Sequence, residues 1–141
     1  MSSRPKKLTD EDFTRLANFR YALRCFLEFS ENAVAGEGLT PQQHQALLVI
    51  RASPDATANI ARLAERLRIR HNTAVELAQR LESAGLISRV QNDEDRRTVL
   101  LNLTEEGTRK LETLTVVHRQ ELAQLSPQIL QLFDNLKSTL E

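Results

Sequence analysis

Residues 60–103 decide the fold, and they read IARLAERLRIRHNTAVELAQRLESAGLISRVQNDEDRRTVLLNL. In the first part of this segment apolar residues recur every three or four positions, which predicts a short helix over 60–67 and a longer one over 72–84. Residues 68–71 between them are expected to form a turn. Gly85 follows the second helix, where glycine is the usual left-handed cap. The segment therefore begins as helix, turn, helix.

The second part of the same segment changes to an alternating apolar pattern. This alternation predicts strands over 86–91 and 98–103, joined by a turn at the charged residues 92–97. Two helices followed by a hairpin with a charged tip form a winged helix-turn-helix. We therefore expect a mainly α fold with a small β hairpin (α+β).

Two helices are predicted before this segment. Thr9 and Asp12 form a capping-box pattern that starts a helix over 9–34. The run Thr40-Pro41-Gln42-Gln43 combines an N-cap, a helix-starting proline and a capping glutamine, which start a helix over 41–52. The apolar arc of the first helix is wider than one core-facing side needs.

Further helix is predicted after the hairpin. Thr104 starts it, with Glu105 and Glu106 at the positive end of the helix dipole. Ser126-Pro127 is expected to start a separate last helix. The predicted organisation is one compact chain with three parts: a flexible tail (1–8), a helical region (9–52 and 104–141) and a winged helix-turn-helix lobe (53–103).

Composition narrows the functional classes. The 141 residues carry 19 basic and 19 acidic side chains, a formal net charge of zero. Between residues 62 and 97, however, eight arginines face six acids, a net charge of +2. The single cysteine, Cys25, cannot form an intramolecular disulfide, and no run approaches the ~18 apolar residues that span a bilayer. We expect a cytoplasmic protein with no membrane segment.

Polar side chains gather at the turn and at the start of the second helix of the pair. A helix fits the DNA major groove, where the residues of its first turn meet base edges and phosphates. The candidate DNA-binding residues are Arg68, Arg70, His71, Asn72, Thr73 and, one turn further on, Glu76. We predict Asn72 to be the N-cap of this helix. The alternative is an ordinary solvated helix start.

The hairpin tip carries a second candidate site. Asp95 and Arg97 are two residues apart on an extended segment, so their side chains leave on the same side. The carboxylate could hold the Arg97 guanidinium extended toward a narrow, negative minor groove. Arg96 points the other way and is better placed for phosphate. The alternative is a solvated turn with a weak surface ion pair.

Several of these runs, in this order and spacing, resemble the MarR (multiple antibiotic resistance regulator) family of bacterial transcription factors. The resemblance covers residues 10–140. It is carried by Gly38-Leu39-Thr40-Pro41-Gln42-Gln43, Leu63-Ala64-Glu65-Arg66-Leu67, Gln79-Arg80-Leu81-Glu82-Ser83-Ala84-Gly85-Leu86-Ile87, Asp93-Glu94-Asp95-Arg96-Arg97 and Leu101-Asn102-Leu103-Thr104-Glu105-Glu106-Gly107.

The resemblance implies a homodimer whose terminal helices form a dimerisation region. It also implies a pseudo-palindromic double-stranded DNA operator and a function as a transcriptional repressor. Arg97 would be the minor-groove arginine with Asp95 as its buttress, and residues 70–73 would open the recognition helix. Glu76 stands where many relatives carry a basic residue, so the target sequence is expected to differ from the commonest one.

The resemblance further implies a small aromatic or anionic effector, whose binding residues are unknown at this point. No other cofactor is expected. The three histidines, His44, His71 and His118, lie on separate elements without ligand spacing, which argues against a metal site. Since no nucleophile, base and orienting group come together, we do not expect an enzyme.

Two alternatives remain open from the sequence. A winged-helix protein-interaction module without DNA binding would fit the zero net charge and Glu76. A thiol-switched regulator would use Cys25, which we otherwise interpret as a small buried apolar residue.

Overall fold

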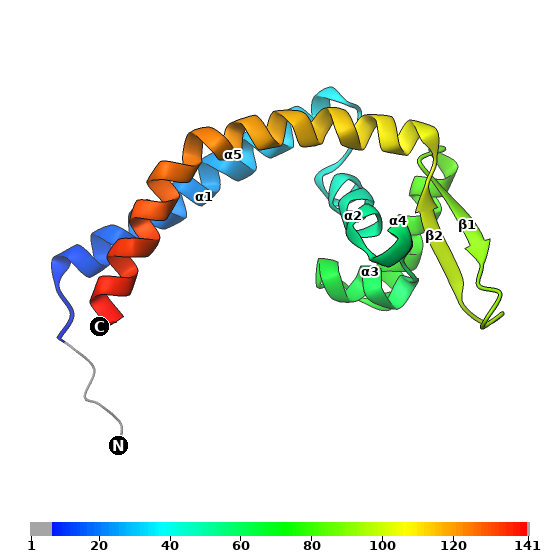
Figure 1. The fold of residues 1–141 in the computed structure, drawn as a ribbon, viewed down its shortest axis with the longest axis horizontal. Helices are drawn as coiled ribbons and strands as arrows, with labels where there is room; N and C mark the ends of the chain where they lie inside the picture. The colour runs from blue at the N-terminus through cyan, green and yellow to red at the C-terminus, as the bar shows by residue number, and fades with distance from the viewer. Residues whose placement is uncertain (1–6, 141) are drawn as a thin grey trace, which may run out of the picture. The chain divides into compact units, whose positions relative to one another are not determined.

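The computed structural model describes residues 7–140, so most of the predicted tail, residues 1–6, and residue 141 lie outside the described residues. The chain is mainly helical with one two-stranded hairpin, as predicted (Figure 1). The elements are α1 (Asp10–Gly36), α2 (Pro41–Ala52), a 3-10 turn η1 (Pro54–Ala56), α3 (Ile60–Leu67), α4 (His71–Ser83), β1 (Ile87–Gln91), β2 (Val99–Leu103) and α5 (Glu105–Leu140).

Side-chain caps fix several of the helix starts that the sequence predicts. The Thr40 hydroxyl accepts from the Gln43 N–H at 3.1 Å, and the Gln43 side chain accepts from the Thr40 N–H at 3.0 Å. Thr9 and Asp12 make the same reciprocal pair before α1. Since these bonds satisfy N–H groups that a helix leaves open, both capping-box predictions are confirmed.

The chain forms two compact units. One comprises the described residues up to Ser30 together with those from His118 onward, and the other comprises Glu31–Val117. The second unit, which we call the winged-helix unit, contains α2, whereas the sequence placed 9–52 with the terminal helices. The physical reason is burial, because Ala46, Leu47 and Ile50 of α2 are fully enclosed in the core of the winged-helix unit.

The core of the winged-helix unit is aliphatic and draws on α2, α3, α4, the hairpin, the end of α1 and the start of α5. Its largest fully buried side chains are Leu47, Ile50, Leu63, Leu81, Ile87, Leu101, Leu114 and Val34. On α4 the buried face is Ala74, Leu77, Ala78 and Leu81. This inward face leaves the opposite face of α4 to solvent.

The hairpin is tied to the helices at both ends. Ile87 pairs with Leu103 and Gln91 with Val99 in an antiparallel register. Backbone bonds between Ala58 and Leu101 add a short bridge from the loop before α3. Gly85, with φ +75°, adopts the left-handed conformation predicted for the residue after α4. The wing is thereby anchored beside the helix pair.

One helix boundary was predicted incorrectly. The sequence indicated a break at Ser126-Pro127, whereas α5 runs as one helix of 36 residues with Pro127 inside it. Proline removes one helical hydrogen bond and crowds the preceding turn, but it does not forbid a helix that continues on both sides. Here tertiary packing on either side of Pro127 outweighs this local signal.

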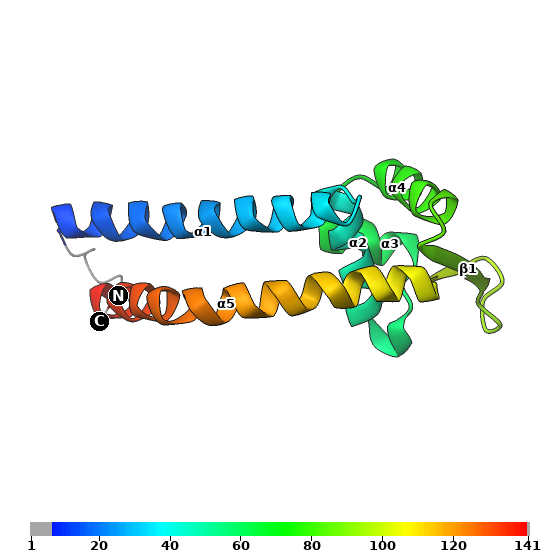
Figure 2. The ribbon, with the colours of Figure 1, turned by 90° about the horizontal axis from the view of Figure 1, so that it is seen from above.

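The terminal unit is built from α1 and α5, which lie side by side and antiparallel (Figure 2). His118 Nε2 lies 2.7 Å from Ser30 Oγ, and the His118 ring packs edge-on against Phe26 and Phe29. Toward the other end, the rings of Phe19 and Phe133 are 5.8 Å apart. These contacts pack α1 against α5, but the described side chains of this unit stay half-buried or exposed.

The described residues of this unit also expose many large apolar side chains to solvent. Tyr21 is 72% exposed and Phe13 is 62% exposed, and they are joined by Leu8, Leu16, Leu23, Leu27, Leu122, Leu130 and Phe133. This is the wide apolar arc that the sequence showed in the first helix. A monomer rarely leaves so many large apolar side chains in water.

Candidate nucleic-acid interface

The turn between α3 and α4 presents two of the predicted arginines. Arg68 ends α3 in the left-handed conformation, with φ +57°, and its N–H bonds back to the carbonyls of Ala64 and Glu65. Arg70 is extended and occupies the N-cap position of α4. Both side chains are exposed, and both line a shallow hollow beside Ala64, Glu65 and Ile69.

The predicted N-cap at Asn72 is wrong. α4 begins at His71, one residue earlier, and its N-cap Arg70 makes no side-chain capping bond. The turn is short enough that the backbone enters the helix at Arg70, whose carbonyl accepts from Ala74 at 3.0 Å. Because arginine has no acceptor atom, the first N–H groups of α4 receive no cap from it.

The other predicted residues of α4 lie on or beside its solvent face. His71, Asn72 and Glu76 are exposed, and Thr73 is half-buried. Asn72 and Glu76 are four residues apart and so lie one above the other on the helix surface. The structure therefore brings hydrogen-bonding side chains together on the face opposite the core.

At the wing tip, Asp95 makes a different contact from the predicted one. Its Oδ1 accepts from the backbone N–H of Arg97 at 3.0 Å, and its Oδ2 accepts from the Thr98 hydroxyl at 3.1 Å. Among the ion pairs of the described residues, none joins Asp95 to the Arg97 guanidinium. An aspartate favours such a bond to the backbone two residues on, which closes a tight turn. Asp95 thus orders the turn that carries Arg97.

Arg96 and Arg97 are both exposed at this tip. The Arg96 carbonyl accepts from the Gln91 side chain at 3.1 Å, which joins the turn to the end of β1. The Asn92 side chain accepts from the Glu94 N–H at 3.0 Å on the other side of the turn. These bonds leave the guanidinium groups directed to solvent and restrain the backbone that carries them.

A groove of about 330 Å³ runs between the helix starts and the wing. We call it the helix–wing groove, and its lining residues are Asn59, Ile60, Ala61, His71, Arg89, Arg97, Thr98 and Val99. Of the predicted site residues, His71 and Arg97 meet here, whereas Arg68 and Arg70 line the separate hollow. Asp95, Arg96, Asn72, Thr73 and Glu76 line neither.

Sequence reasoning missed Arg89 as a candidate DNA-binding residue. Arg89 is in phase with the buried Ile87 along β1 and pairs with the buried Leu101, although Arg89 itself is exposed. A charged residue in phase with buried residues is uncommon unless it is paired. This feature of the sequence could have identified Arg89 as a candidate. Its partner is Glu82, whose Oε2 lies 3.1 Å from Arg89 Nε.

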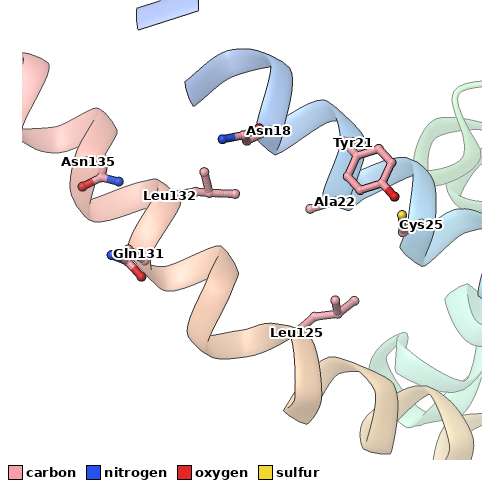
Figure 3. Close-up of a pocket in the computed structure, with 8 residues that line it drawn as sticks. All are labelled: Asn18, Tyr21, Ala22, Cys25, Leu125, Gln131, Leu132 and Asn135. Carbon is pink, nitrogen blue, oxygen red and sulfur yellow. The ribbon is translucent and has the colours of Figure 1, made fainter. Parts of the chain in front are cut away.

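A second cavity, of about 420 Å³, lies in the terminal unit between α1 and α5 (Figure 3). Asn18, Tyr21, Ala22 and Cys25 line it from α1, and Leu125, Gln131, Leu132 and Asn135 line it from α5. Cys25 is half-buried at this cavity rather than enclosed in a core, which corrects the expectation of a buried apolar residue. The hydrogen bond between the Tyr21 hydroxyl and the Cys25 side chain raises the pKa of Tyr21.

The side chains that the structure describes contain no cluster of three or more His, Cys, Asp or Glu that could hold a metal ion. Within residues 7–140, no helix combines the length and the apolar content that crossing a bilayer requires.

An exposed helix start beside a hairpin with a cationic tip defines a winged helix-turn-helix of the DNA-binding class. Residues 37–98 match the family model described as the MarR family. The HTH-type transcriptional repressor MdtR of Bacillus subtilis is 30% identical over 112 residues, which cover 79% of this chain and 68% of that protein. The chain belongs to the MarR family.

Two other comparisons agree with this assignment. The organic hydroperoxide resistance transcriptional regulator of B. subtilis is 35% identical over 69 residues, which span 49% of this chain and 46% of that protein. A mutant MarR from E. coli, solved in complex with operator DNA, has the same fold, with a TM-score of 0.68 at 22% identity over 96% of this chain and all of that one.

Proposed function

We propose that this chain is a homodimeric transcriptional repressor that binds a pseudo-palindromic site on double-stranded DNA and is released by a small molecule. The observation that carries the proposal is the pairing of an uncapped, exposed helix start with a wing tip that displays Arg96 and Arg97. The proposal assigns no catalysis to the chain, and it places the protein in the cytoplasm with the chromosome.

The solvent face of α4 is suited to reading bases. Asn72 can donate to and accept from an adenine edge, and Thr73 can contact either kind of base pair. Glu76 would repel phosphate, but its carboxylate can accept from the amino group of a cytosine. We therefore propose that Asn72, Thr73 and Glu76 specify the sequence, with Arg68 and Arg70 beside them at the phosphates.

The wing supplies the second contact with DNA. An arginine that enters a narrow minor groove gains from the strong negative potential there. Arg97 is assigned this role because Asp95 orders the turn beneath it. Arg96 is assigned to a backbone phosphate next to the same groove.

Dimerisation follows from the exposed apolar face of the terminal unit. The large apolar side chains along α1 and α5 would be covered by the same face of a second copy, which gives a twofold interface. Two copies related in this way present two recognition helices, and that symmetry matches a pseudo-palindromic site.

The proposed effector is a small aromatic compound. The cavity between α1 and α5 is large enough for one, and Asn18, Gln131 and the Tyr21 hydroxyl offer uncharged polar contacts (Figure 3). Its lining contains no charged residue, so it offers an anionic compound no counter-charge. An effector that binds the DNA-free dimer more tightly would lower the affinity for DNA.

Footprinting and fluorescence anisotropy test the proposal directly. The purified protein should protect one site in DNA flanking its own gene, and it should bind that site at least about 1,000-fold more tightly than a shuffled duplex of equal composition. Log affinity should fall linearly with log salt. Equal affinity for both duplexes, or no salt-dependent retention, would instead indicate a winged helix that has lost sequence-specific DNA binding.

The effector is tested separately with a melting-temperature screen of phenolic compounds. A compound that raises Tm and weakens operator binding supports release by a small molecule. A screen in which the compounds that raise Tm leave operator affinity unchanged argues against it.

A further inference from the structure

The helix–wing groove combines cationic side chains with two helix starts, and no acidic residue lines it. We propose that this groove is a binding site for one phosphate of the DNA backbone, with Arg89 as its principal ligand. The inference rests on the proposed DNA-binding function and adds a residue that the motifs do not include.

Arg89 is held in a defined orientation by a single ion pair. Its Nε lies 3.1 Å from Glu82 Oε2, and its side chain is 33% exposed. A guanidinium is planar with five donors, so engaging Nε fixes the plane and leaves the two terminal Nη groups available. Within the described part of the chain, no other hydrogen bond or ion pair involves the Arg89 side chain. A bidentate fork is thus preorganised for an anion.

The other walls of the groove reinforce an anion site. Ile60 and Ala61 are the first residues of α3, and His71 is the first residue of α4. The first N–H groups of a helix lack internal partners and carry the positive end of the helix dipole. At α3 the Asn59 side chain takes the N–H of Arg62, whereas α4 receives no side-chain cap. The starts of both helices therefore favour a negative group in the groove.

The position of Arg89 favours a phosphate over a base edge. Arg89 lies in the middle of β1, opposite Leu101, rather than at the wing tip, and its ion pair holds the side chain against Glu82 near the end of α4. Base edges lie at the floor of the DNA grooves and can be reached only by protruding side chains, whereas phosphates project from the duplex toward the protein. A fork that is held against Glu82 at mid-strand can therefore receive a phosphate but does not extend to the floor of a groove.

Salt-dependent binding of the full-length protein tests this assignment. Arg89→Ala should weaken binding to the operator and to a shuffled duplex by the same factor, about tenfold or more, and so leave their ratio unchanged. The slope of log affinity against log salt should fall by about 0.9 for each subunit that loses a phosphate contact, or about 1.8 for a dimer. Arg89→Lys, which keeps the charge, should restore the slope but not the full affinity.

A matched control is Arg109→Ala. Arg109 also pairs with a glutamate of the winged-helix unit, Glu106 at 2.6 Å, but it does not line the groove. This variant should keep the wild-type slope. If Arg89→Ala fails to fold by circular dichroism, Arg89→Gln, which keeps the stem and a donor for Glu82, carries the same prediction.

Each outcome separates the inference from the function on which it rests. A wild-type protein that does not bind DNA overturns the proposed function and this inference with it. Wild-type binding with an unchanged slope and affinity in the Arg89 variants overturns the inference alone. A loss confined to the operator would show a base contact and would equally overturn the phosphate assignment.

Discussion

The carboxylate of Asp95 accepts a hydrogen bond from the backbone N–H of Arg97 at 3.0 Å, and this bond closes the turn at the wing tip. Because the bond joins the Asp95 side chain to the backbone of Arg97, it fixes the position of the Arg97 backbone and does not engage the guanidinium. The wing is therefore an ordered turn that carries an exposed cationic side chain.

Arg97→Ala should weaken operator binding by about 1–3 kcal/mol, the range of a lost groove contact. Fluorescence anisotropy at one fixed salt concentration measures this change. Arg51→Ala, which removes an exposed arginine of α2, is the control and should stay close to wild type. An Arg97 variant with wild-type affinity would show that Arg97 does not contact the operator.

Asp95→Ala should weaken operator binding by about 0.5–1.5 kcal/mol, because the turn loses its bond to the Arg97 N–H and its bond to the Thr98 hydroxyl. The global Tm should hardly change, since the turn is exposed and away from the core. Asp93→Ala, at an exposed aspartate of the same turn, serves as the comparison. If both variants bind equally well, the ordering role of Asp95 is wrong.

Arg70→Ser should stabilise the protein and weaken its binding to DNA. Serine at the N-cap of α4 supplies the acceptor that arginine lacks, which is worth about 0.5–1 kcal/mol in the free energy of unfolding. The same change removes a cation from the DNA-facing turn. Urea denaturation and operator titration measure the two effects, and a decrease in stability would contradict the observed N-cap position.

Gly107→Ala should destabilise the protein by about 1–3 kcal/mol through overpacking. A Cβ at Gly107 would overlap with the carbonyl oxygen of Leu86, which also accepts from the Thr104 N–H at 3.0 Å. Neither atom can move without disturbing the junction of β2 and α5. Gly36→Ala, where a Cβ meets open space, is the control, and equal Tm values for the two variants would refute this packing argument.

Leu16→Glu should shift the protein from dimer to monomer in sedimentation velocity at micromolar concentration. Leu16 is 55% exposed on the apolar face of α1, and a charge there would be buried against the second copy. Leu48→Glu places the same charge at a 45% exposed position on α2, in the winged-helix unit, and should leave the dimer intact. A dimeric Leu16 variant would place the interface elsewhere.

Local chemistry explains why so many elements could be predicted from the sequence. α2 and α3 begin and end at the predicted residues, and the start of α2 is fixed by Thr40, Pro41 and Gln43, which act within one turn. Gly85 adopts the predicted left-handed conformation for the same reason. The predicted hairpin is also confirmed. Its alternating pattern is a short-range signal as well, because every second residue of a strand points to the same face.

The errors arise where something outside the short sequence signal overrides it. Pro127 predicts a helix boundary when only its neighbours are considered, yet α5 continues through it. Asn72 is a good capping residue, yet the short turn after α3 starts α4 at His71. At Pro127 tertiary packing overrides a preference of about 3 kcal/mol, whereas at Asn72 the path of the preceding turn overrides a capping preference of about 0.5–2 kcal/mol.

The linear order of residues was enough to establish a helix pair with a wing, because periodicity and capping act over a few residues. It was also enough to single out the arginines of the turn and the tip. Only the folded chain could show that His71, Arg89 and Arg97 line one groove, since they come from α4, β1 and the wing turn. Which side chains from separate elements meet depends on strand register and helix packing, and neither is encoded in any single stretch of the chain.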